Sequence, residues 1–104
     1  MSQLISIDIQ IGMKYAANNR DLYFKMVDRF YNSYQEIDIE SMSGDEFKSA
    51  IHNLKTISMY IGALSLHDIA KNIDENGAIE QLPNLVFEIG KVLKDIQTLL
   101  NQEH

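Results

Sequence analysis

The chain has 104 residues, of which 45% are hydrophobic and 23% charged, as expected for one soluble globular domain spanning residues 1–104. Fifteen acidic residues against nine basic ones give a formal net charge of −6, which argues against nucleic acid and membrane surfaces as partners. No apolar run approaches the ~20 residues of a membrane span, no secretory signal is evident, and the absence of cysteine excludes disulfides and thiolate chemistry. We therefore expect a monomeric cytoplasmic protein.

The start of the chain has the least regular pattern. Residues 4–11 alternate apolar and polar side chains like a strand, and residues 36–40 do so briefly, which leaves a two-stranded pairing open. Because an isolated hairpin is only marginally stable, we favour an extended start instead. In this interpretation Asp8 is the N-cap of a short helix from Ile9 to about Ala17.

The next two predicted helices are amphipathic. From Asn19 to about Glu36, apolar residues recur at spacings of three and four. Ser43 and Glu46 then form a capping-box pattern ahead of a second apolar stripe, and Gly62 lies near the end of that helix.

Two more helices complete the predicted fold. Ser65 and Asp68 repeat the capping pattern ahead of a third stripe, which Gly77 is placed to terminate. Pro83 suits the first turn of a last long helix. The apolar stripe of that helix comprises Leu85, Val86, Ile89, Val92, Leu93, Ile96, Leu99 and Leu100. Four such helices with short loops predict an all-α antiparallel four-helix bundle with a short N-terminal capping helix.

The helix after Ser43 carries the chemistry. At about 100° per residue, its core-facing positions lie within roughly 60° of Leu54: Phe47, Ala50, Ile51, Ile57, Ser58 and Ile61. His52 lies about 160° from Leu54, on the opposite face. The neighbours of His52 on that face are Lys48, Lys55, Thr56 and Met59.

An exposed imidazole beside two lysines suits a dianionic phosphoryl group. A free imidazole is in large part a neutral nucleophile at cellular pH, and a lysine three residues away is within reach of a group attached to it. Taken alone, however, a surface histidine is far more often only a solvated residue. The chain shows no zinc-ligand spacing, no Ser/His/Asp set and no phosphate-binding glycine loop. These patterns alone indicate an acidic helical bundle of undetermined role.

Residues 52–66 resemble the signature of the histidine phosphotransfer (HPt) family. In that signature the phosphorylated histidine is followed by x-Leu-Lys-Gly, a small residue, an apolar residue, Gly-Ala and then Leu. The residues in register with it are His52, Leu54, Lys55, Ser58, Ile61, Gly62, Ala63 and Leu66. Thr56 stands where the family usually has glycine, and Ile57 and Met59 are larger than usual.

The resemblance implies a phosphocarrier with no kinase activity of its own. His52 would be the phosphoacceptor and Lys55 would stabilise its phosphoryl group. Because they share the exposed face of His52, we expect Lys48, Thr56 and Met59 to face the partner. The partners implied are receiver domains of response regulators or of a hybrid sensor kinase. The chain needs no metal or cofactor of its own, since Mg²⁺ is expected on the receiver.

Two other functions remain open. In the first, the bundle is an adaptor that binds receiver domains without phosphotransfer, because Thr56 blocks close approach. In the second, it is a structural or oligomerising domain and the motif match is accidental.

Overall fold

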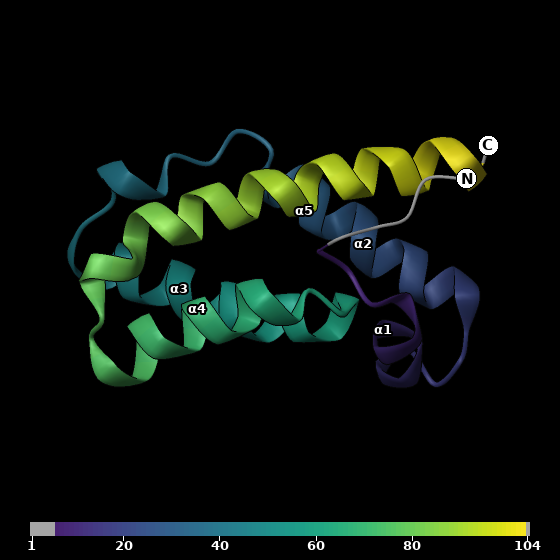
Figure 1. Cartoon of the computed structure of the whole chain (residues 1–104), viewed down its shortest axis with the longest axis horizontal. Helices are drawn as coiled ribbons and strands as arrows, with labels where there is room; N and C mark the ends of the chain where they lie inside the picture. The colour runs from purple at the N-terminus through teal and green to yellow at the C-terminus, as the bar shows by residue number, and fades with distance from the viewer. Residues whose placement is uncertain (1–5, 104) are drawn as a thin grey trace.

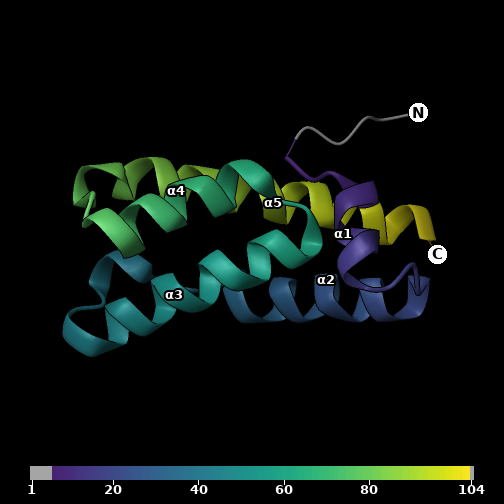
Figure 2. The ribbon, with the colours of Figure 1, turned by 90° about the horizontal axis from the view of Figure 1, so that it is seen from below.

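The computed structural model describes residues 6–103, and every regular element in this range is helical (Figure 1). In chain order the elements are α1 (Ile9–Tyr15), α2 (Arg20–Tyr34), the 3-10 turn η1 (Ile39–Ser41), α3 (Gly44–Ile61), α4 (Leu64–Asn76), the 3-10 turn η2 (Ile79–Gln81) and α5 (Leu82–Glu103). The four long helices alternate in direction along the long axis, and α1 packs across one end (Figure 2). The predicted bundle with its short N-terminal helix is therefore confirmed. None of the helices in the described range is long and apolar enough to cross a membrane.

The beginning of α1 follows the predicted pattern. The Asp8 side chain caps the helix by accepting a hydrogen bond of 3.2 Å from the Ile11 amide. The helix ends at Tyr15, two residues before the predicted end, because Ala17 and Asn18 adopt left-handed φ values of 54° and 59°. Residues 36–40 pair with no strand in the described range, so the two-stranded alternative is wrong there. Residues 1–5 lie outside that range.

The predicted helix caps are confirmed only in part. The cap of α2 was not predicted: the Asn19 side chain accepts a hydrogen bond from the Leu22 amide at 3.1 Å. Ser43 does occupy the N-cap position of α3, but its side chain makes no capping hydrogen bond, so the predicted capping box does not form. Gly77 ends α4 in the left-handed conformation, with φ of 66°, as expected.

The turn between α3 and α4 is shorter than the sequence pattern indicated. Gly62 adopts φ of 83°, and α4 starts two residues later, with Ala63 at its N-cap, so the prediction of Ser65 as N-cap is wrong. The physical reason is that the Ala63 carbonyl already accepts the first helical hydrogen bond, from the His67 amide at 2.9 Å. The Asp8 amide donates to the Gly62 carbonyl at 2.8 Å, which fastens the N-terminal segment over this turn.

The apolar stripes of the helices meet in one core. Its fully buried residues on α2 to α5 include Tyr23, Val27, Phe30, Leu54, Ile61, Leu66, Ala70, Leu85, Val92 and Ile96. The predicted stripe of α5 is confirmed, since each of its members is buried or packs against the core. Burial, followed by the nearby charge of Asp8, raises the pKa of Tyr23. The protonated Tyr23 hydroxyl donates to the Ile61 carbonyl at 2.9 Å and ties α2 to the end of α3.

Candidate functional site

His52 stands on the outer face of α3, as the angular pattern predicted. Its side chain is 62% exposed, whereas Leu54, Ser58 and Ile61 are 0% exposed on the opposite face. The buried face fixes the rotation of α3 about its axis. The imidazole is therefore presented to solvent from a rigid helix.

A carboxylate from α4 holds the imidazole on one side. The Nδ1 atom of His52 lies 3.3 Å from Oδ2 of Asp74. The same oxygen accepts a hydrogen bond of 2.7 Å from Nζ of Lys55, and that ammonium also lies 3.5 Å from Glu75. Residues 52, 55 and 74 therefore form one hydrogen-bonded cluster, of which the sequence analysis found the histidine and the lysine and missed the aspartate.

The charges in this cluster stabilise one another. The hydrogen bond from Lys55 lowers the pKa of Asp74 below its ordinary value of 3.8; the hydrogen bond from His52 adds to this lowering, and burial opposes it. The hydrogen bond to Asp74 likewise raises the pKa of Lys55. Asp74 and Lys55 therefore both remain ionised across the neutral pH range.

The contact with Asp74 also selects the tautomer of His52. A neutral imidazole has one N–H donor and one acceptor nitrogen, and an ionised carboxylate only accepts. Because Nδ1 faces the Asp74 carboxylate, we assign the proton to Nδ1. The lone pair is then on Nε2, across the ring from Asp74, so Nε2 is the nucleophilic atom.

The other residues predicted on this face differ in accessibility. Lys48 and Thr56 are exposed, as expected. The Thr56 hydroxyl donates back to the His52 carbonyl at 3.3 Å, a bond common for mid-helix threonines, which holds its side chain against α3. Met59 is half-buried, so it presents less surface to a partner than predicted.

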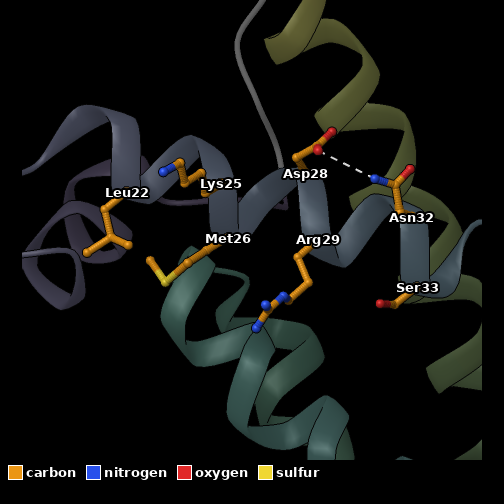
Figure 3. Close-up of a pocket in the computed structure, with 7 residues that line it drawn as sticks. All are labelled: Leu22, Lys25, Met26, Asp28, Arg29, Asn32 and Ser33. Carbon is orange, nitrogen blue, oxygen red and sulfur yellow. Dashed lines mark hydrogen bonds between the residues drawn. The ribbon is translucent and has the colours of Figure 1, made fainter.

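A groove of about 550 Å³ opens between α2 and α3 on the side of His52 away from α4. Its lining comprises Met26, Arg29, His52, Asn53, Thr56, Ile57 and Tyr60. Figure 3 shows that the side chains of Met26 and Arg29 reach from α2 toward α3. The sequence analysis did not identify Arg29, because only the packing of α2 against α3 brings it beside the imidazole.

The second histidine of the described chain has a structural position. Nδ1 of His67 lies 2.7 Å from the Lys55 carbonyl, and the side chain is half-buried between α3 and α4. His104 lies outside the described residues. Within residues 6–103, no group of three or more His, Asp or Glu side chains is arranged to hold a metal ion.

The geometry of the site is thus a positioned imidazole, a half-buried charge pair and an open groove. Comparisons of the chain with protein-family models, curated proteins and solved structures found no match.

Proposed function

We propose that this chain is a histidine phosphocarrier. His52 accepts a phosphoryl group from the aspartyl phosphate of a receiver domain, in a response regulator or a hybrid sensor kinase, and passes it to another aspartate. The observation that carries the proposal is the exposed imidazole whose Nδ1 is held by Asp74, which leaves Nε2 free for attack. The resemblance of residues 52–66 to the HPt signature supports the same chemistry.

The geometry supports a direct displacement at phosphorus. Nε2 of His52 attacks the phosphoryl group, the Nε2–P bond forms, and the P–O bond to the partner's aspartate breaks to leave a carboxylate. The ring gains positive charge during the attack, and the Asp74 carboxylate, 3.3 Å from Nδ1, stabilises it. Mg²⁺ bound to the receiver would neutralise the phosphoryl oxygens. The reverse reaction with a second aspartate empties the carrier.

Asp74→Asn is expected to slow phosphoryl transfer to His52 by roughly tenfold, because a charge-assisted hydrogen bond becomes a neutral one weaker by about 1 to 1.5 kcal/mol. Initial rates of labelling from a phosphorylated receiver measure the effect. The matched control is Glu75→Gln, since Glu75 contacts Lys55 at 3.5 Å and has no bond to His52. Equal slowing by the two substitutions would show that Asp74 acts through its negative charge alone and not through its hydrogen bond to His52.

The lowered pKa of Asp74 predicts that the free energy of unfolding depends on pH. The pKa of Asp74 is lower in the fold than in the unfolded chain, so its contribution is present above 3.8 and is lost as the pH falls through the folded value. Wild type should therefore exceed Asp74→Asn in free energy of unfolding at pH 6, and the difference should disappear in acid. Urea titrations across this range provide the measurement. A difference that persists below the folded pKa would contradict the assignment.

Thr56→Arg is expected to block transfer, because a long exposed side chain one turn after His52 would stand in the path of the partner's aspartate. Thr56→Gly should broaden or speed transfer among receivers, at a cost of about a few tenths of a kcal/mol in helix propensity. Transfer rates for wild type and both variants against several receivers test this. If the arginine variant transfers as fast as wild type, position 56 does not face the partner.

Incubation with phosphorylated receiver domains separates the proposed function from its alternatives. A phosphocarrier becomes labelled on His52 and returns the label to an unphosphorylated receiver. Receivers that bind the chain without labelling it would indicate an adaptor. Neither binding nor labelling would indicate a structural or oligomerising domain.

A further inference from the structure

The basic side chains around His52 differ in whether they form ion pairs with carboxylates. The ammonium of Lys55 lies within 3.5 Å of two carboxylates, those of Asp74 and Glu75. Asp74 and Glu75 therefore compete with an incoming phosphoryl group for the Lys55 ammonium. A dianionic phosphoryl group therefore gains the full attraction of Lys55 only when Lys55 leaves these carboxylates.

Arg29 occupies the opposite side. It is exposed on α2 and lines the same groove as His52. Within the described part of the chain, no carboxylate forms an ion pair with Arg29. Arg29 also lines the adjoining hollow on α2 together with Asp28, but the Asp28 carboxylate accepts a hydrogen bond of 3.4 Å from Asn32 and forms no ion pair with Arg29 (Figure 3). The Arg29 guanidinium is therefore the cation that faces the groove unneutralised.

We propose that Arg29 binds the phosphoryl group on Nε2 of His52, a role that rests on the proposed phosphocarrier function. Nδ1 is directed toward Asp74 on α4, so Nε2 is directed away from that carboxylate. His52 and Arg29 both line the groove between α2 and α3. A guanidinium offers two parallel N–H donors that match the oxygens of a phosphoryl group. Arg29 and Lys55 then flank the phosphoryl group from two helices, with Arg29 supplying the free charge.

The groove has room for this arrangement. Its volume of about 550 Å³ exceeds that of a phosphoryl group, so a partner side chain carrying the leaving carboxylate fits beside it. Its lining also includes the apolar side chains of Met26 and Ile57 and the aromatic ring of Tyr60. Apolar side chains beside a docked phosphoryl group reduce its contact with water, which strengthens its attraction to the guanidinium.

The test uses phosphoramidate, a small phosphoryl donor that needs no protein partner. Its P–N bond breaks, the Nε2–P bond forms and ammonia leaves, so the rate reports the site of this chain alone. Wild type, Arg29→Gln and Arg29→Lys are compared with a matched control, Lys25→Gln. Lys25 lies one turn earlier on α2, in the hollow that does not include His52.

Arg29→Gln is expected to slow labelling of His52 by roughly tenfold and to speed loss of the label once the donor is removed, since a charge-assisted hydrogen bond to the phosphoryl group is lost. Arg29→Lys should retain part of the wild-type labelling rate and of the wild-type lifetime of the label. Lys25→Gln should stay within about twofold of wild type in both quantities. A shorter lifetime of the label indicates that Arg29 contacts the phosphoryl group. Circular dichroism checks separately that the variant keeps its helical fold.

Three results would overturn the inference. If wild type is labelled on His52 and Arg29→Gln behaves like wild type, Arg29 does not bind the phosphoryl group, and the phosphocarrier function stands. If Lys25→Gln slows labelling as much as Arg29→Gln, the positive charge of α2 attracts the anionic donor in general and Arg29 has no specific role. If wild type takes no label on His52, either from phosphoramidate or from a phosphorylated receiver, the phosphocarrier function fails and this inference fails with it.

Discussion

His52→Gln is expected to abolish phosphoryl acceptance while leaving the fold intact. A glutamine amide is no nucleophile at phosphorus, and no other imidazole in the described range is presented in the same way. The free energy of unfolding should change by no more than about 0.5 kcal/mol, because the His52 side chain is 62% exposed. Labelling from a phosphorylated receiver and urea denaturation measure the two effects separately.

The matched control for this variant is His67→Gln. His67 is half-buried and its Nδ1 bonds the Lys55 carbonyl, so the substitution should lower stability by about 1 kcal/mol and leave acceptance in place. Loss of labelling in both variants, at normal stability, would mean that neither imidazole can be assigned as the acceptor. Persistent labelling of His52→Gln would contradict the proposed site.

Gly62→Ala is expected to reduce the free energy of unfolding by about 2–4 kcal/mol. Gly62 has φ of 83°, which strains an alanine by about 1–3 kcal/mol. An added Cβ would also collide with the carbonyl oxygen of Asp8, and such overpacking costs about 1–3 kcal/mol. Relieving that collision requires the N-terminal segment to give up the 2.8 Å hydrogen bond from the Asp8 amide to the Gly62 carbonyl.

Gly77→Ala isolates the backbone component of this effect. Gly77 has a comparable φ of 66°, but a Cβ added there would meet no atom within 4 Å other than those of Gly77 itself and its chain neighbours. The Gly77→Ala substitution should therefore reduce the free energy of unfolding by only about 1 kcal/mol. Urea denaturation of the two variants gives both values. Equal losses would show that the N-terminal segment does not pack tightly over the turn after α3.

The sequence predicted the helices well because each depends on local information. Apolar spacing, Asp8 as N-cap and Gly77 as terminator act within a few residues of one another. The start of α4 could not be placed from this pattern. Ser65 has the chemistry of an N-cap, but the left-handed turn at Gly62 lets the helix begin before it.

The candidate site was predictable only as far as α3 extends. The angular pattern separated His52 from the buried face, and the resemblance to the HPt signature suggested the roles proposed for His52 and Lys55. Asp74 comes from another helix, so its contact depends on the register of the α3–α4 hairpin. One signal was present: His52 lies eleven residues before Ala63 and Asp74 eleven residues after it, so an antiparallel hairpin with this turn brings them together. Arg29 had no comparable signal, since no short turn fixes α2 against α3.

The most direct test of the proposed function is to locate the phosphoryl group on the chain after incubation with phosphorylated receiver domains. The proposed function predicts one acid-labile phosphoryl group, on Nε2 of His52, that transfers to a fresh receiver and is absent from His52→Gln. Peptide mapping by mass spectrometry locates the residue, and phosphorus NMR distinguishes the two ring nitrogens. The absence of phosphate from the chain, or its presence on His67 or on Nδ1 of His52, would contradict the assignment of His52 Nε2 as the acceptor.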